Sequence, residues 1–142
     1  MGEDMKVYFM FSKKYAISLC VLVLIASIFL SAFSQSRVKV GAENEAERSG
    51  YLLKLGYECS EPVAIKEVNI PAEFDGNFEK LNAVVKKSGF DLSVYKGETV
   101  ELYTYLYDKH KQINMFVYKG YLIGSYITDL QNVQIYPLQK VS

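Results

Sequence analysis

Few side chains in this 142-residue chain could carry out chemistry. The single histidine is His110, and the two cysteines are Cys20 and Cys59. A zinc site needs three or four convergent His, Cys or carboxylate ligands, and a nucleophilic Ser or Cys needs a base beside it. His110 lies in the charged turn DKHK, and its spacing from Cys59 does not suggest contact. The sequence therefore predicts no metal site, no cofactor and no catalytic residue of these kinds.

Two carboxylates and a row of tyrosines remain as candidates. Asp108 and Asp129 both end predicted strands, where acidic residues can serve acid–base chemistry but more often make turns. Tyr103, Tyr105 and Tyr107 alternate along one strand, so their side chains share a face. If that face is exposed, the rings could stack on cell-wall sugars or hold a protein; if it is buried, they belong to the core. We take the three tyrosines as the candidate binding residues.

The charge balance argues against nucleic acid as a partner. The chain has 16 basic and 16 acidic side chains, a formal net charge of +0. A surface that binds nucleic acid needs an excess of basic residues to displace counterions. We therefore expect no nucleic-acid partner.

The longest apolar stretch lies near the start of the chain. Residues 15–33 read YAISLCVLVLIASIFLSAF and contain no charge. A helix of that length spans roughly 28 Å, close to the hydrocarbon thickness of a bilayer. Lys13 and Lys14 precede it, and this lysine bias places residues 1–14 in the cytoplasm and the remainder outside. The sequence thus predicts a single-pass protein of the cell membrane that contacts the lipid bilayer through residues 15–33.

A cleaved signal peptide is the alternative for this stretch. Ala32, Phe33 and Ser34 make an acceptable small-x-small cleavage site, although the apolar run exceeds the roughly 7–15 residues typical of a signal peptide. With a retained anchor, Cys20 lies in the bilayer and Cys59 is the only cysteine outside. The outer domain then has no internal disulfide.

The sequence beyond this stretch divides into three parts. Residues 34–44 are polar and read as a tether, and residues 45–129 read as one extracytoplasmic domain. Residues 130–142 form a tail, which either adds a small strand or lies over the surface.

Two helices are predicted in the domain. Asn44 and Glu47 have the spacing of a capping box at the start of the first helix, which ends at Gly56. An apolar stripe at spacings of four, three and four marks the second helix. Its residues are Phe74, Phe78, Leu81 and Val85.

The stretch SGFDLSVYKG, residues 88–97, is the segment that most resembles a functional loop. Gly89 stands where a helix ends in the left-handed conformation, and Phe90 is placed to pack back on Val85. Asp91 suits a turn in which its carboxylate binds backbone amides, followed by one short helical turn. Each of these features has a structural role, so we predict a corner of the fold rather than a ligand loop.

Four strands are predicted. Residues 63–70 lie between Pro62 and Pro71, which favours an edge strand. Their alternation slips once, between Ile65 and Val68, which favours a bulge. The segments TVELYTYLY, QINMFVY and YLIGSYIT alternate, with DKHK between the first two and a hairpin at Lys119 and Gly120 between the last two. The predicted fold class is α+β: one N-terminal transmembrane helix, then two helices packed on a mostly antiparallel sheet of about four strands.

The face of this sheet that is buried depends on the register of DKHK. If Tyr107 pairs with Gln112, and Tyr118 with Tyr121, one face is aliphatic and the other carries the tyrosine row. The aliphatic face then holds Val100, Leu102, Leu106, Ile113, Met115, Val117 and Leu122. The other holds Glu101, Tyr103, Tyr105, Tyr107, Asn114, Phe116, Tyr118, Tyr121, Ile123 and Ser125. We expect the aliphatic face to meet the helix stripe, whereas a register slip in DKHK would flip the first strand relative to the other two.

Four patches, in order along the chain, resemble one protein family. They are YLLKLGYECSEPVAIKEVNIPAEF, KSGFDLSVYKG, LYTYLY and FVYKGYLIG. The family is uncharacterised, domain of unknown function 4830, and its members are membrane-anchored proteins of Gram-positive bacteria. The resemblance covers about residues 45–129 and implies an extracytoplasmic α+β domain behind a single span, with no known activity or catalytic residue. It also favours burial of the tyrosine row, because the family places polar residues where Leu102 and Leu106 stand.

The chain departs from the family pattern at two places. The turn at residues 108–111 is shorter, and the tail after Asp129 does not match. We expect the domain to act by binding, as an accessory module for a protein or cell-envelope partner. The alternatives are a small cell-wall enzyme that uses Asp108 and Asp129, and a regulatory subunit of a neighbouring membrane protein.

Overall fold

A computed structural model describes residues 39–142, which form an α+β domain of two helices on an antiparallel sheet of six strands. In chain order the elements are β1 (Val40–Gly41), α2 (Glu45–Lys54), β2 (Ala64–Asn69), α3 (Gly76–Lys87), the 3-10 turn η1 (Leu92–Tyr95), β3 (Thr99–Asp108), β4 (Lys111–Tyr118), β5 (Tyr121–Asp129) and β6 (Gln134–Pro137). The predicted segment 1–14, the predicted transmembrane helix 15–33 and Cys20 lie outside the described residues. Within residues 39–142, no helix is long and apolar enough to cross a bilayer.

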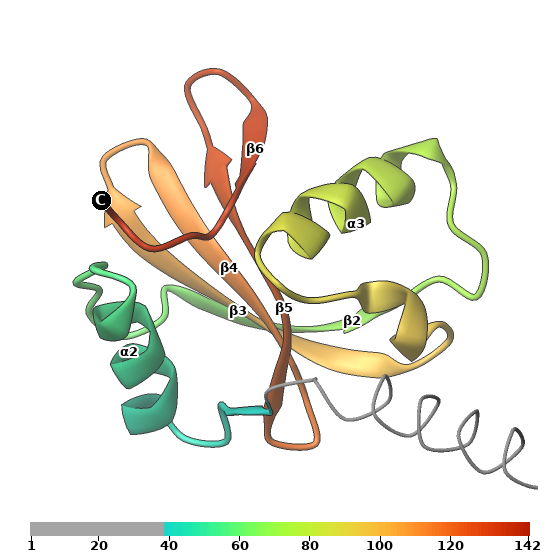
Figure 1. The fold of residues 1–142 in the computed structure, drawn as a ribbon, viewed down its shortest axis with the longest axis horizontal. Helices are drawn as coiled ribbons and strands as arrows, with labels where there is room; N and C mark the ends of the chain where they lie inside the picture. The colour runs from blue at the N-terminus through green and yellow to red at the C-terminus, as the bar shows by residue number, and fades with distance from the viewer. Residues whose placement is uncertain (1–38) are drawn as a thin grey trace, which may run out of the picture. The chain divides into compact units, whose positions relative to one another are not determined.

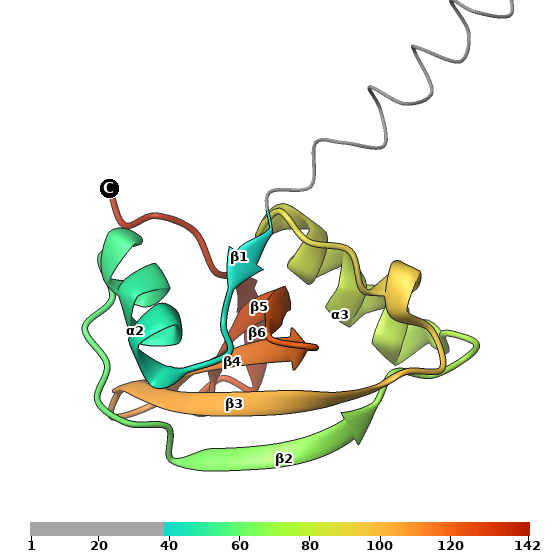
Figure 2. The ribbon, with the colours of Figure 1, turned by 90° about the horizontal axis from the view of Figure 1, so that it is seen from below.

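The strands follow the order β1-β5-β4-β3-β2, and β6 also pairs with β5. Every neighbouring pair is antiparallel. Figure 1 shows α2 on one side of the sheet and α3 on the other. In Figure 2 the two helices again lie to either side of β1, β4 and β5. The α+β class is confirmed, with more strands than predicted. The additional strands are β1, within the predicted tether, and β6, within the predicted tail.

Local hydrogen bonds fix the ends of α2 where the sequence places them. The Asn44 side chain accepts the N–H of Glu47 at 3.0 Å, as an N-cap should. After the helix, Gly56 has φ +91°, and Tyr57 donates its N–H to the carbonyl of Leu52 at 2.9 Å. This is the glycine-terminated helix end that the sequence predicts.

Residues 88–97 form a corner, as predicted. Gly89 has φ +93°, and Phe90 donates its N–H to the carbonyl of Val85 at 3.3 Å. The Asp91 carboxylate accepts the N–H of Ser93 at 3.0 Å and its hydroxyl at 2.6 Å. Burial alone would raise the pKa of Asp91, but these hydrogen bonds contribute to lowering it to about 2. The Phe90 ring contacts both core clusters, so it serves packing.

The turn after β3 gives the sheet a register different from the expected one. Leu106, not Tyr107, pairs with Gln112, and pairing resumes between Asp108 and Lys111. Tyr107 is therefore the extra residue of a β-bulge. Because a slip of one residue moves side chains to the opposite face, β3 is flipped relative to β4 and β5, which is the alternative that the sequence left open.

The second hairpin starts in the predicted register, but a bulge at Ile123 shifts the pairing by one residue, so that Met115 lies opposite Ser125. The prediction that Ser125 shares the face of Asn114 is therefore wrong. Tyr118 pairs with Tyr121, and the two residues between them, Lys119 and Gly120, have φ values of +50° and +78°. Positive φ at both central residues is the signature of a type I′ turn, whose twist matches that of the strands.

Both faces of the sheet are buried, so the prediction that only the aliphatic face forms the core is wrong. The cluster on the side of α2 includes Leu52, Tyr103, Tyr105, Ile113, Met115, Val117 and Leu122. The cluster on the side of α3 joins the predicted stripe of Phe74, Phe78, Leu81 and Val85 to Val100, Leu102, Phe116 and Ile123. Sheets covered on both faces carry apolar side chains at successive positions, which hides the alternation that a one-sided sheet would show.

Strand β2 is an edge strand, as predicted. It pairs with β3 from Ala64 to Asn69 without a register shift, so the expected bulge is absent from this strand. Pro62 and Pro71 lie just beyond its ends. Since proline cannot donate to a ladder, the two residues limit its length.

Arg48 connects α2 to the sheet from a buried position. Its side chain donates to the carbonyl of Ala42 at 2.8 Å, to the hydroxyl of Tyr105 at 3.0 Å and to the carboxylate of Glu45 at 3.2 Å. The guanidinium also lies 3.8 Å from the centroid of the Tyr103 ring. A buried charge needs such partners, because removing it from water without them costs several kcal/mol.

Replacing Tyr105 should therefore destabilise the domain more than replacing Leu102. Tyr105→Ala is expected to lower the free energy of unfolding by about 3–5 kcal/mol, because it empties a fully buried site and removes an acceptor from Arg48. Leu102→Ala should cost about 1–2 kcal/mol, because Leu102 is only partly buried. Equilibrium urea unfolding measures both, with Tyr105→Phe separating the ring from the hydroxyl. A larger cost for Leu102→Ala would contradict the observed burial.

Candidate functional site

A cavity of about 310 Å³ lies where β3 ends and β4 begins. Its walls come from the loop after α2, from β3, β4, β5 and β6, and from the last residues of the chain. The lining residues are Tyr57, Tyr107, Lys111, Ile127, Asp129, Tyr136 and Val141. Five of these seven side chains are tyrosine or aliphatic, and the tyrosine hydroxyls, Lys111 and Asp129 supply polar groups, so the lining can contact both apolar and polar parts of a small molecule.

Two of the tyrosines are positioned by backbone features described above. Tyr57 follows the glycine that ends α2, and Tyr107 is the bulged residue of β3. Their rings meet edge to face, with centroids 4.8 Å apart. The Tyr57 hydroxyl donates to the carbonyl of Gln139 at 2.9 Å, and burial raises its pKa, so it remains a neutral donor. The bulge thus directs Tyr107 toward the end of α2.

The chain after β6 forms one wall of the cavity. Leu138 is buried, and its N–H bonds the Ser88 hydroxyl at 2.8 Å. Val141 donates its N–H to the carbonyl of Leu55 at 2.8 Å. Residues 138–141 therefore run from the end of α3 to the end of α2. The part of the chain predicted as a separate tail belongs to the domain.

The charged residues of the cavity are Lys111 and Asp129, which oppose each other on β4 and β5. The Asp129 carboxylate accepts the N–H of Gln131 at 2.9 Å, and it accepts both the N–H and the side-chain amide of Asn132 at 3.2 and 3.0 Å. The hydrogen bonds from Asn132 lower the pKa of Asp129. Both carboxylate oxygens are therefore occupied by the turn after β5, and no ion pair within 4.0 Å joins Lys111 to Asp129 in the described part of the chain.

The two predicted acid–base candidates lie at the same end of the sheet. Asp108 and Asp129 both pair with Lys111, one from β3 and one from β5. Asp108 is exposed, and its carboxylate accepts the N–H of Lys109 in the tight turn. Each carboxylate thus has the turn-forming role that the sequence offered as the alternative to chemistry.

The predicted tyrosine row is not an exposed surface. Tyr103 and Tyr105 are 8% and 0% exposed, beneath α2 and in contact with Arg48. Tyr107 is 37% exposed and contributes to the cavity. The structure separates Tyr107 from the other two because the bulge interrupts the alternation after Leu106.

Sequence reasoning missed the other side chains of the cavity. Tyr57 and Tyr136 lie far apart in sequence from Tyr107, and no local pattern connects the three. The sequence offers one signal for these residues: Tyr57 follows Gly56, the glycine that ends a helix, so its ring is predicted to lie near the end of α2.

His110 and Cys59 do not form a site. His110 lies in the β3–β4 turn, where its carbonyl accepts the N–H of Leu130 at 2.7 Å. Cys59 is half-buried against the cluster on the side of α2, and this burial raises the pKa of its thiol. Within residues 39–142, no group of three or more His, Cys, Asp or Glu side chains is arranged to hold a metal ion.

No known protein family, curated protein or solved structure matches this chain. The cavity and the surfaces of the domain are therefore the basis for inferring function.

Asp129→Asn tests whether this carboxylate is structural. The variant places an amide donor opposite the Asn132 side-chain donor, so the thermal midpoint should fall at pH 7. A carboxylate with a lowered pKa stabilises the fold above its unfolded pKa of about 3.9, and this stabilisation is lost as the pH falls through the lower, folded value. The difference between variant and wild type should therefore shrink below about pH 4. Calorimetry from pH 3 to pH 7 measures it, and an unchanged midpoint at pH 7 would contradict the structural role.

Proposed function

We propose that this chain is a membrane-anchored binding protein of the cell envelope, whose domain lies outside the membrane. The predicted span at residues 15–33 and the lysines before it support the anchor and its orientation. The domain begins soon after that stretch, since β1 starts at Val40.

The tyrosine cavity carries the proposal that the domain binds a ligand. Its volume of about 310 Å³ is at the small end of the usual range for ligand pockets, so a ligand of about one sugar ring fits the space. Tyr107 and Tyr136 are 37% and 41% exposed, so each ring has surface available to the apolar face of a sugar. Lys111 adds a donor for a ring hydroxyl or a carboxylate. We therefore propose a saccharide of the cell wall as the ligand.

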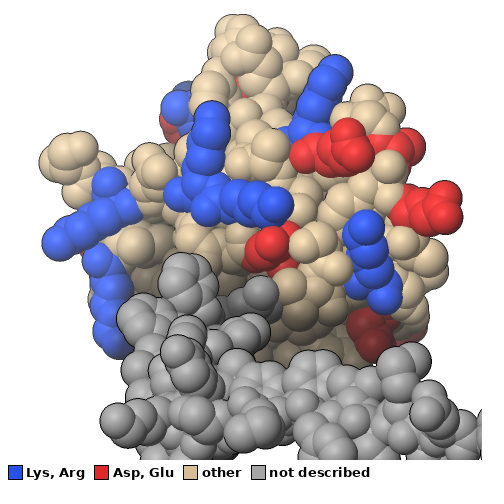
Figure 3. Space-filling model, turned by 45° about the vertical axis from the view of Figure 1, so that its right-hand side comes forward, with Lys and Arg blue, Asp and Glu red and all other residues tan. Residues whose placement is uncertain are grey.

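The charge on one face of the domain supports a partner of this kind over a polyanion. On the face shown in Figure 3, basic and acidic side chains lie near each other, and neither sign covers the surface. A binding surface for nucleic acid would instead present a continuous basic stripe.

The alternative of a cell-wall enzyme rests on Asp108 and Asp129. A general acid that works near neutral pH needs a raised pKa, whereas the pKa of Asp129 is lowered. The two carboxylates are also engaged in turns. These observations favour binding over hydrolysis.

Removal of one exposed cavity tyrosine should weaken ligand binding without unfolding the protein. Tyr107→Ala and Tyr136→Ala are each expected to reduce the affinity for soluble cell-wall saccharides by about 2- to 13-fold, since aromatic stacking contributes about 0.5–1.5 kcal/mol. Calorimetric titration of the full chain in detergent micelles measures the affinity. The matched control is Tyr121→Ala, because Tyr121 is 45% exposed at the β4–β5 hairpin and does not line the cavity. Equal affinities in all three variants would reject the cavity as the site.

Protease protection tests the placement of the domain. Protease added to intact protoplasts should degrade residues 39–142, while a cytoplasmic marker protein stays whole. Full protection of the domain would place it in the cytoplasm and contradict the proposal.

A further inference from the structure

Within residues 39–142, the edge of the sheet at β2 has unpaired backbone groups. β2 is the last strand of the path, and Figure 2 shows no described element beyond it. The N–H of Ile70 bonds the carbonyl of Glu98 on the side of β3, and backbone direction alternates along a strand. Ile65, Glu67 and Asn69 therefore direct their N–H and C=O groups outward. Such a row is a template for an added strand.

Two exposed side chains at the start of this edge are apolar. Val63 and Ile65 are each 57% exposed, and the partner of Ile65 across the ladder is Tyr103. Natural edge strands are protected by a short length, a bulge or charged side chains. β2 has six residues and an unbroken register, so its protection consists of Lys66, Glu67 and the flanking prolines.

An unfavourable charge pair stands next to the same edge. Glu67 lies directly opposite Glu101. Because the backbone groups of Glu67 point away from β3, the two residues form a pair without mutual hydrogen bonds. In such pairs the side chains of the two strands come closest. Like charges in that arrangement destabilise a sheet. Among the described residues, neither carboxylate has a Lys or Arg within 4.0 Å, although Glu101 accepts the hydroxyl of Tyr103 at 3.1 Å. A basic side chain on an added strand would lie beside Glu67 and pair with it.

A second copy of this chain does not fit the edge well. Antiparallel pairing of two copies of β2 requires a twofold axis perpendicular to the sheet, so one residue faces its own copy. In the central registers that residue is Lys66 or Glu67, which brings like charges together. Lys66 of one copy cannot pair with Glu67 of the other. Paired residues must both direct their backbone groups outward or both inward, and only Glu67 directs them outward.

We propose that β2 binds an extended segment of a partner protein by strand addition. The segment carries a basic residue opposite Glu67, an acidic residue opposite Lys66 and an apolar residue opposite Ile65. In the antiparallel direction this is the order basic, acidic, apolar. The site is separate from the tyrosine cavity, and the inference does not depend on the saccharide proposal.

A labelled peptide provides the test. The probe is a capped ten-residue peptide of alternating Thr and Val with Lys-Glu-Val at its centre, titrated against the full chain in detergent micelles and followed by fluorescence anisotropy. N-methylation of its Lys, whose N–H faces the edge, should abolish binding. N-methylation of its Glu, whose N–H points away, should leave binding unchanged.

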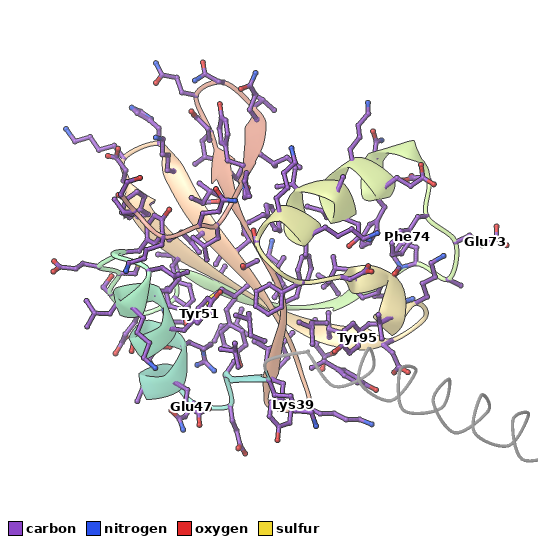
Figure 4. The ribbon with its side chains drawn as sticks, viewed as in Figure 1. Lys39, Glu47, Tyr51, Glu73, Phe74 and Tyr95 are labelled. Carbon is purple, nitrogen blue, oxygen red and sulfur yellow. The ribbon has the colours of Figure 1, made fainter. Side chains whose placement is uncertain are left out.

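Charge reversal identifies the binding edge. Glu67→Lys should weaken binding at least tenfold, and a peptide with Glu in place of its Lys should restore it. The thermal midpoint should not fall, because the change relieves the repulsion with Glu101. The matched control is Glu73→Lys, an exposed residue that points away from the sheet in the loop before α3 (Figure 4), which should bind like the wild type. Tyr107→Ala should also bind the peptide normally.

Three results would overturn the inference. One is the absence of peptide binding at millimolar concentration. Another is an equal effect of the two N-methyl groups, which would indicate contact through side chains alone. The third is self-association of the chain that Glu67→Lys abolishes, because the occupant of the edge would then be a second copy.

Discussion

A guanidinium buried between α2 and β3 is the interaction on which the rest of the domain depends. Arg48 donates to a backbone carbonyl, a tyrosine hydroxyl and a carboxylate, and it lies over the Tyr103 ring. Because the charge is stable out of water only with these partners, α2 is held in one position on the sheet. That position covers Tyr103 and Tyr105. It also brings the end of the helix, with Tyr57, to the cavity.

The features predictable from sequence were those encoded within a few residues. The N-cap at Asn44, the left-handed glycines at Gly56 and Gly89, and the hairpin at Lys119 and Gly120 all follow from local backbone preferences. Arg48 could not be identified in this way. A charged residue on a helix normally faces water, and its burial depends on a hydroxyl 57 positions further along the chain.

The register of β3 and the cavity share one cause. The turn after β3 contains a bulge at Tyr107, and nothing in DKHK distinguishes a bulged turn from a regular one. That single residue decides which face each side chain of β3 occupies. It also turns Tyr107 away from its predicted row. The other walls come from segments far apart in sequence, so periodicity could indicate a tyrosine-rich strand but not a pocket.

Strand β5 pairs with β4 along one edge and with both β1 and β6 along the other. Its partners on that second edge come from the first and the last strands of the described domain. The pairing with β6 is local, because Asp129 lies opposite Gln134 across a short turn. The pairing with β1 is not, because Val40 lies opposite Leu122, and closing so long a loop costs entropy and slows folding. The segment of β1 therefore has no strand partner until β5 is made, so the two ends of the domain are joined late in folding.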